Sequence, residues 1–181
     1  MTMVAFTIRK ACAGDAVALP ALEQSAGALF ATLPDLAWLT EGDNRSVAAY
    51  RALIEGGYCW VAVDDTGRRC GFLAAEPLGD ALHINEIAVA RDRQRRGIGT
   101  TLMRTAIRAG APFRAITLTT FADVAWNAPY YERIGFRRLL PDKLGPALCA
   151  ILKHEADAGL QGRCAMRLLV DRTGCTDRPR G

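Results

Sequence analysis

Two short segments between residues 84 and 136 contain the residue types that bind or transfer chemical groups. The first begins as an expected strand, Ile84–Val89, and passes through a basic turn into Gln94-Arg95-Arg96-Gly97-Ile98-Gly99 and a helix. The N-terminus of a helix has unbonded N–H groups and the positive end of the helix dipole, so it binds anions such as phosphate. Gly97 and Gly99 allow a close backbone approach, and Arg95 and Arg96 add positive charge. The segment therefore predicts a diphosphate site on the N–H groups of residues 95–100.

Three other interpretations of this turn make different demands on the sequence. A P-loop needs a lysine after its second glycine, and here Thr100 and Thr101 follow Gly99. A dinucleotide-binding fingerprint needs G-x-G-x-x-G at a first strand–helix turn, whereas this spacing is G-x-G and three antiparallel-type strands precede it. A purely structural turn also uses glycines, and the first segment alone leaves this alternative open.

A second motif, Tyr130-Tyr131-Glu132-Arg133-Ile134-Gly135-Phe136, follows further along the chain and makes the structural-turn alternative weaker. Together the two segments resemble the Q/R-x-x-G-x-G/A and Y-E-x-x-G-F signatures of the GNAT superfamily of N-acetyltransferases. The resemblance in the order of expected elements extends from Val4 to Val170. The motifs are specific for the superfamily and do not identify a substrate.

The resemblance implies that the ligand is acetyl-CoA. Its diphosphate would lie on the turn and the helix start, and its pantetheine arm would run along the backbone of the preceding strand, beside a splayed gap in the sheet. The implied coenzyme-binding residues are Ile87, Ala88, Val89, Gln94, Arg95, Arg96, Gly97, Ile98, Gly99, Thr100 and Asn127.

Acetyl transfer to an amine requires a base, a polarised thioester carbonyl and a proton for the leaving thiolate. Glu86 lies on the expected coenzyme strand between apolar neighbours, where burial would raise its pKa, so it is the candidate base. A water chain as the base, or a structural arginine partner for Glu86, stays open. Tyr131 is the candidate acid, and the Val89 N–H is the candidate donor to the thioester carbonyl. We expect Tyr130 to serve in packing.

Asn127 departs from the pattern of the superfamily. Many members have an asparagine seven residues before the tyrosine, where this chain has Val124, and Asn127 lies only four residues before Tyr131. Asn127 is therefore either a helix cap or a displaced coenzyme ligand.

The acceptor amine in this superfamily enters near the first two helices and the loop after the fifth strand. The candidate acceptor-binding residues there are Phe30, Trp38, His83, Thr119, Phe121 and Trp126, although for any one of these aromatics core packing is the better explanation. The only acidic residues noted nearby are Asp35, Glu41 and Asp123. The pattern favours a small amine with an apolar body over a strongly cationic acceptor.

Hydrophobic periodicity predicts the order βααβββαβαβαβ. This order resembles that of the GNAT fold, and the resemblance implies an α/β (α+β) fold with a mixed, mostly antiparallel sheet of about seven strands and helices on both faces. We expect one domain over residues 1–170 and a flexible tail over residues 171–181. Leu33–Glu41 is predicted to be a loop, and Asp15 is predicted to cap the first helix.

The composition excludes several classes of function. The 181 residues carry a formal net charge of +4, and the arginines cluster locally, so the sequence predicts no nucleic-acid partner. Six scattered cysteines without a C-x-x-C pair predict neither a metal site nor a disulfide framework. The chain shows no signal peptide and no membrane-spanning run, so we expect a cytoplasmic protein. A homodimer is possible by resemblance.

The leading hypothesis is an N-acetyltransferase that moves an acetyl group from acetyl-CoA to a primary amine, favoured to be a small molecule. The alternatives are a protein or peptide N-acetyltransferase and a non-catalytic acetyl-CoA-binding module on the same fold.

Overall fold

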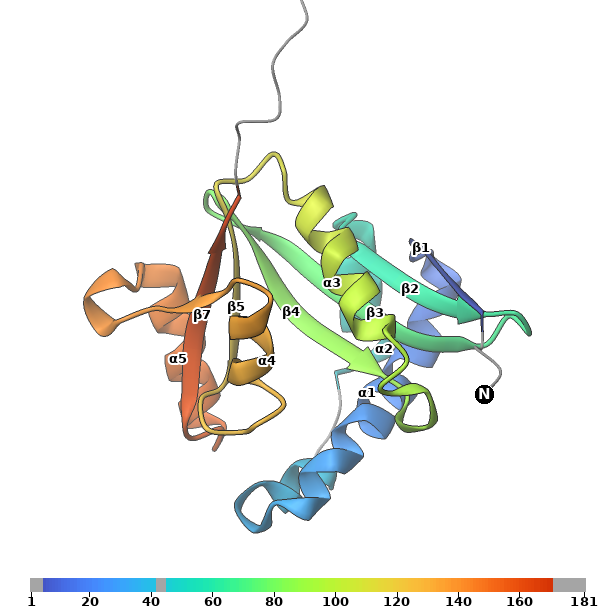
Figure 1. The fold of residues 1–181 in the computed structure, drawn as a ribbon, viewed down its shortest axis with the longest axis horizontal. Coiled ribbons are helices and arrows are strands. Elements are labelled where there is room, and N and C mark those ends of the chain that lie inside the picture. The colour runs from blue at the N-terminus through green and yellow to red at the C-terminus, as the bar shows by residue number, and fades with distance from the viewer. Residues whose placement is uncertain (1–4, 42–44, 171–181) are drawn as a thin grey trace, which may run out of the picture. The chain divides into compact units, whose positions relative to one another are not determined.

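A computed structural model describes residues 5–41 and 45–170 of the chain, and its element order matches the predicted one (Figure 1). The hydrogen-bonded order of the seven strands is β1-β2-β3-β4-β5-β7-β6. The strands are β1 (Phe6–Lys10), β2 (Cys59–Asp64), β3 (Arg69–Leu78), β4 (Ala81–Val89), β5 (Ala115–Phe121), β6 (Arg137–Arg138) and β7 (Arg163–Leu169). The α-helices are α1 (Leu19–Gly27), α2 (Val47–Glu55), α3 (Ile98–Ala109), α4 (Ala128–Arg133) and α5 (Pro146–Asp157). The predicted fold class is confirmed.

The chain divides into two compact units. The first unit contains the residues up to Glu76 together with Asn85–Arg108, and the second contains Pro77–Ile84 and the residues from Ala109 onward. Strand β4 contributes its first half to the second unit and its second half to the first unit. The prediction of a single domain stays a prediction, and the two units are described one at a time below.

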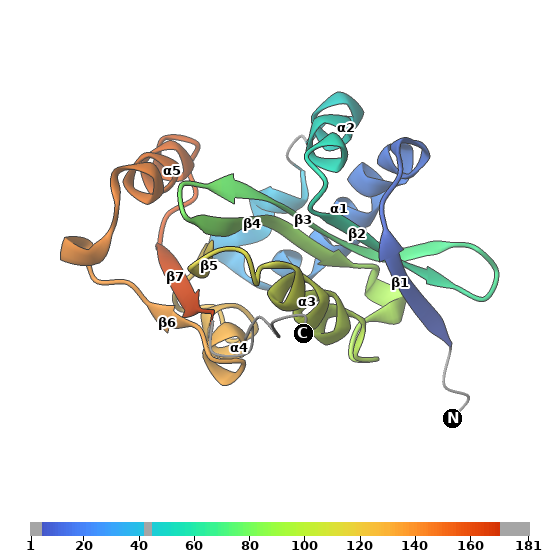
Figure 2. The same cartoon turned by 90° about the horizontal axis from the view of Figure 1, so that it is seen from above.

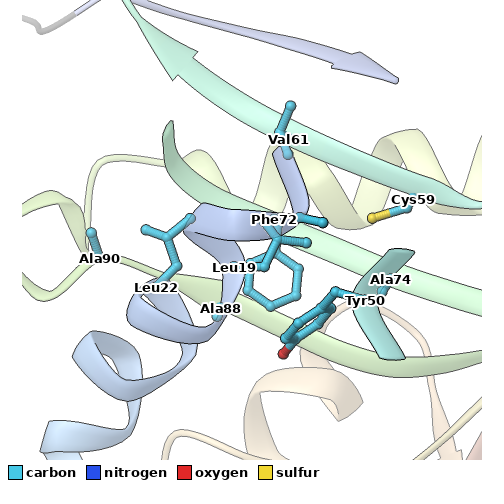
Figure 3. Packing of buried hydrophobic residues seen from close by; sticks show 10 residues of the cluster. Leu19, Leu22, Tyr50, Cys59, Val61, Phe72, Ala74, Ala88 and Ala90 are labelled. Atoms are coloured by element: carbon cyan, nitrogen blue, oxygen red, sulfur yellow. The ribbon is translucent and has the colours of Figure 1, made fainter. Parts of the chain in front are cut away.

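In the first unit, β1, β2 and β3 form an antiparallel meander. Helices α1 and α2 lie on one face of these strands and α3 lies on the other (Figure 2). The core beneath α1 and α2 joins Leu19 and Leu22 of α1, Tyr50 of α2, and Phe72 and Ala88 of the sheet (Figure 3). Burial of this apolar surface fixes both helices on the strands.

Helix α3 packs against β3 through a glycine. A Cβ at Gly71 would lie 3.1 Å from Ile98 Cγ2 and 3.4 Å from Leu102 Cδ1, and the first distance is shorter than most Cβ contacts, so Ile98 would have to shift. Ile98 and Leu102 are buried, as the helical periodicity predicts. The absence of a side chain at Gly71 therefore lets the start of α3 lie directly on the sheet.

In the second unit, the first half of β4 pairs in parallel with β5, and β5 and β6 both pair antiparallel with β7. Helix α5 is linked to this sheet by an ion pair between Glu155 and Arg163, with Arg163 Nη2 2.8 Å from Glu155 Oε1. The hydroxyl of Thr119 on β5 donates to the same Glu155 oxygen at 2.6 Å. This polar cluster holds α5, β5 and β7 together.

Four local expectations need correction or fall outside the described residues. The segment expected to be a loop, Leu33–Glu41, is largely the 3₁₀ helix η3 (Pro34–Thr40), which follows the 3₁₀ helix η2 (Ala28–Thr32). Asp15 is not the first cap, because the 3₁₀ helix η1 (Ala13–Ala18) begins two residues earlier with Cys12 at its N-cap. Val4 and the expected tail, 171–181, lie outside the described residues. No helix in the described part of the chain is both long and apolar enough to span a bilayer.

Candidate active site

The turn between β4 and α3 is built by two residues with left-handed backbone conformations. Arg95 has a φ of 60° and Gly97 a φ of 82°. Glycine adopts this region without strain, whereas for arginine it is uncommon. The side-chain amide of Gln94 donates to the Val89 carbonyl at 3.1 Å and so closes the turn onto the end of β4. Gln94 therefore has a structural role here, and its predicted contact with a coenzyme stays a prediction.

The start of α3 is open around its glycines. The first helical backbone hydrogen bond runs from the Thr101 N–H to the Gly97 carbonyl at 2.9 Å. The N–H groups of Ile98 and Gly99 precede this bond in the chain and therefore belong to the helix start, where N–H groups have no acceptor within the helix. A Cβ at Gly97 would meet nothing within 4 Å, and one at Gly99 would meet only Val89 Cγ2 at 3.7 Å. The packing of the described residues therefore does not require glycine at position 99. The open space fits an anionic group that approaches the backbone from outside.

The four arginines of this turn divide into two kinds. The guanidinium of Arg91 donates to the Ala28 carbonyl, and that of Arg93 pairs with Asp64 at 3.2 Å. Arg95 and Arg96 are exposed, and neither forms an ion pair within the described part of the chain. The two arginines predicted to bind the diphosphate thus have no acidic partner among the described residues.

The orientation of the Val89 peptide follows from its neighbours. A Cβ at Gly71 of β3 would lie 3.0 Å from the Ala88 carbonyl oxygen, so that oxygen points toward β3. In a trans peptide the C=O and N–H groups point in opposite directions, so the Val89 N–H points away from β3. The Ala90 N–H donates to the Cys70 carbonyl of β3 at 3.0 Å, which turns the Val89 carbonyl away from β3 as well.

The second half of β4 lies outside the pairing between β4 and β5. That register covers Ala81–Ile84 of β4, and Ile87, Ala88 and Val89 come after it. Polar backbone groups on a strand edge are able to bind an extended ligand. The Val89 N–H, which points to this edge, is such a group.

Glu86 on β4 belongs to an acidic cluster with Glu23 of α1 around Tyr50 of α2. Tyr50 is fully buried, and its hydroxyl donates to Glu23 Oε2 at 2.6 Å. Burial, the bond to Glu23 and the negative charge of Glu86 together raise the pKa of Tyr50 far above its ordinary value. The expectation of a buried Glu86 is wrong, because the side chain is half-buried. Sequence reasoning missed Glu23 and Tyr50, since only the packing of α1 and α2 on β4 brings them together.

In the second unit, Tyr131 lies on α4 between two aromatic rings. Its ring makes edge-on contacts with Tyr130 at 5.2 Å and with Phe136 at 5.8 Å between centroids. Phe136 is fully buried, and its N–H donates to the Tyr131 carbonyl at 3.0 Å. The Tyr-Glu-x-x-Gly-Phe motif therefore fixes the half-buried Tyr131 ring against a core phenylalanine.

Asn127 stands at the N-cap position of α4, where its backbone carbonyl accepts from the Tyr130 N–H at 2.9 Å. Its side chain makes no capping hydrogen bond. The cap interpretation therefore holds for the backbone of Asn127 and is wrong for its side chain.

The six predicted acceptor-binding residues fall into both units. Phe30 lies on η2 and Trp38 on η3 of the first unit, and Trp38 is 43% exposed. In the second unit Trp126 is 38% exposed and His83 is buried, with its Nδ1 3.0 Å from the Thr117 hydroxyl.

The remaining two predicted acceptor residues belong to the polar cluster that ties α5 to the sheet. Thr119 bonds to Glu155, as described above. The guanidinium of Arg163 lies 4.9 Å from the centroid of the buried Phe121 ring. Sequence reasoning missed Glu155 and Arg163, which are distant from Thr119 in the chain.

Comparison with known proteins decides which family this geometry represents. A family profile described as an acetyltransferase (GNAT) domain matches residues 55–138, which span β2 to β6 and include the α3 turn and Tyr131. Residues 55–138 belong to the GNAT acetyltransferase family. The match confirms the predicted family for this segment and indicates an acyltransferase enzyme.

Solved GNAT structures share the fold over nearly the whole chain. The ribosomal-protein-S18-alanine N-acetyltransferase of Escherichia coli is 18% identical, with a TM-score of 0.66 over 96% of this chain and 99% of that one. The PaiA N-acetyltransferase of Thermoplasma acidophilum, solved in complex with coenzyme A, is 13% identical, with a TM-score of 0.66 over 91% and 99%. The N-acetylglutamate synthase of Neisseria gonorrhoeae, solved with coenzyme A and N-acetyl-glutamate, is 16% identical, with a TM-score of 0.69 over 94% of this chain and 36% of that one.

Proposed function

We propose that this GNAT protein transfers the acetyl group of acetyl-CoA directly to the primary amine of a small molecule. The observation that carries the proposal is the open start of α3. There, backbone amides precede the first helical bond, Gly99 has no packing neighbour that demands a glycine, and Arg95 and Arg96 lack ion-pair partners among the described residues. These groups fit the diphosphate of coenzyme A.

In the proposed reaction the amine nitrogen attacks the thioester carbonyl carbon, the C–S bond breaks, and coenzyme A leaves as a thiolate. Glu86, directly or through a water chain, removes the proton that the ammonium group must lose before its nitrogen attacks. The nitrogen loses a second proton as the amide forms, which balances the proton that the thiolate takes up. The hydroxyl of Tyr131 supplies a proton to the thiolate, and the Val89 N–H donates to the carbonyl oxygen as it gains charge. Asn127, whose side chain does not cap α4, is a proposed coenzyme contact.

The acceptor is proposed to combine an amine with an apolar body. The exposed rings of Trp38 and Trp126 offer apolar contact surface, each in its own unit. The carboxylates of Glu23 and Glu86 make the region around Tyr50 more acidic than the sequence suggested, and this charge favours an ammonium group. A single cationic amine fits this cluster.

A peptide N-terminus is the second candidate acceptor. The observation in its favour is the likeness to the ribosomal-protein-S18-alanine N-acetyltransferase, which covers nearly the whole of both chains. A non-catalytic coenzyme-binding module is disfavoured, because a pure binder needs neither Glu86 nor Tyr131.

The proposal is tested by incubating the protein with acetyl-CoA and a panel of aromatic and aliphatic primary amines, amino acids and short peptides, while free thiol is measured. We expect release of coenzyme A with a small aromatic or aliphatic amine and an acetylated product of matching mass. Turnover only with peptides would move the protein to the second candidate. Tight coenzyme binding with no turnover across the panel would contradict the enzymatic proposal.

A further inference from the structure

A row of four residues crosses the sheet of the second unit and ends in two arginines. The pairing registers join His83 of β4 to Thr117 of β5, Thr117 to Arg167 of β7, and Arg167 to Arg137 of β6. Residues directly opposite in neighbouring strands point to the same face, and like charges at such positions destabilise the pair. Within the described residues neither Arg137 nor Arg167 has an acidic partner. The fold thus keeps an unfavourable pair of charges.

The two arginines border a surface hollow of about 450 Å³, here named the β6–β7 groove. Its lining also includes Lys143 and the leucines Leu140 and Leu169, which are 65% and 68% exposed. Exposed leucines beside exposed cations form a surface that has both an apolar and a positive part. Exposed apolar surface that is rimmed by polar groups is typical of protein–protein interaction sites.

Strand β6 is the last strand in the sheet order, so one of its edges has no strand partner among the described residues. Charged residues on a short edge strand also protect it from aggregation, and this explains Arg137. It does not explain Arg167, because β7 lies between β5 and β6 and is no edge.

We propose that the β6–β7 groove binds an extended acidic peptide segment of another protein. Its carboxylates pair with Arg137 and Arg167, its apolar side chains cover Leu140 and Leu169, and its backbone lies along the edge of β6. A nucleic acid fits less well, since the described lining contains no aromatic side chain on which a base stacks. A second copy of the chain also fits less well, because a symmetric contact through this groove would bring arginines together.

The groove can be compared with two of the predicted acceptor residues, Thr119 and Phe121, along the same strand β7. Arg167 lies four residues from Arg163 along β7, which corresponds to about 13 Å of strand. Phe121 pairs with Arg163 itself, and Thr119 pairs with Ala165, midway between Arg163 and Arg167. Peptide binding in the groove and acetyl transfer are measured independently, and failure of one leaves the other intact.

The probe for the test is a fluorescein-labelled decapeptide of alternating glutamate and leucine, with binding followed by fluorescence anisotropy. We expect saturable binding to the wild-type protein and a loss of at least about tenfold in affinity for the double variant Arg137→Gln/Arg167→Gln, which lacks both charge-assisted partners. Peptide should also slow hydrogen exchange at the amides of residues 137–140. The matched control, Arg104→Gln/Arg108→Gln, removes two exposed arginine charges from α3 and should bind as the wild type does.

The thermal stability of the Arg137→Gln/Arg167→Gln variant also shows whether the variant folds. The double variant should melt at a higher temperature than the wild type without peptide, because the repulsion between the two arginines is gone. Three results would each overturn the proposal: absence of saturable peptide binding, equal weakening in both double variants, or equally tight binding of a decathymidylate oligonucleotide. Dimerisation that the double variant abolishes would assign the groove to a second copy instead and would also overturn it.

Discussion

Replacement of Gly99 by alanine tests whether this glycine is required for the stability of the protein or for the binding of its ligand. The new Cβ would meet only Val89 Cγ2 at 3.7 Å, which is ordinary van der Waals contact. Alanine is favoured over glycine in a helix by up to about 1 kcal/mol, so Gly99→Ala should keep or raise stability. For a chain of this length 1 kcal/mol corresponds to a rise in Tm of about 2–4 °C.

The same methyl group would occupy the space at the start of α3 that we assign to the diphosphate. Loss of one hydrogen bond to a charged group costs about 1.5–3 kcal/mol, which corresponds to a roughly 10- to 150-fold weaker affinity for coenzyme A. The assays are thermal unfolding and calorimetric titration with coenzyme A. A stable variant with weakened binding is the expected result.

Gly27→Ala is the matched control for this experiment. Gly27 ends α1, and a Cβ there would meet nothing within 4 Å, so the variant should also be stable while it binds coenzyme A as the wild type does. The reasoning is refuted if Gly99→Ala binds coenzyme A with wild-type affinity. It is also refuted if Gly99→Ala unfolds more easily than the wild type, since the space would then be needed by the protein itself.

Three further predictions concern catalysis and acid stability. Tyr131→Phe should lower kcat by about 10²- to 10⁴-fold in the thiol-release assay while coenzyme A affinity holds; an unchanged kcat would remove Tyr131 as the acid. Glu86→Gln should lower kcat/KM similarly and abolish its acidic pH limb, and a preserved limb would point to another base. The pKa of Asp64 is lowered from 3.8 to about 2, mainly by the Thr66 hydroxyl and also by Arg93, so its contribution to stability is present above 3.8 and is lost as the pH falls through 2. In Asp64→Asn the free energy of unfolding, measured with urea, should therefore fall less steeply than in the wild type as the pH is lowered over this range. An equally steep fall would exclude Asp64 as its source.

The parts of the fold that sequence predicts well are those set by local patterns. The β4–turn–α3 unit follows from a strand pattern, two glycines and the helical spacing of Ile98 and Leu102, and all of these residues are neighbours in the chain. The segment from Ala28 to Thr40 was harder, because its 3₁₀ turns have neither helical nor strand periodicity.

The residues of the candidate site were predicted where they lie in a contiguous motif. They were missed where only the packing of distant segments brings them together. Tyr131 and Gly99 lie in contiguous motifs. Glu23 and Tyr50 lie near Glu86 only because α1 and α2 pack on β4, and no spacing in the sequence predicts this proximity. The Thr119–Glu155–Arg163 cluster was missed for the same reason, since it depends on the docking of α5 on β7.

The same limit applies to the acidic residues considered on the acceptor side. The sequence analysis considered Asp35, Glu41 and Asp123 and did not include Glu23. In the folded chain Glu23 accepts a hydrogen bond from the hydroxyl of the fully buried Tyr50. A carboxylate held in this way is fixed in position, which a periodicity pattern does not reveal.

The most direct test of the account is an NMR titration of the backbone amides of residues 95–100 with coenzyme A and, separately, with pantetheine, which lacks the diphosphate. The account predicts that coenzyme A shifts the amide signals of Gly97, Ile98 and Gly99 and that pantetheine leaves them in place. Equal shifts with both ligands, or no shift with coenzyme A at saturating concentration, would contradict the assignment of the diphosphate to the start of α3.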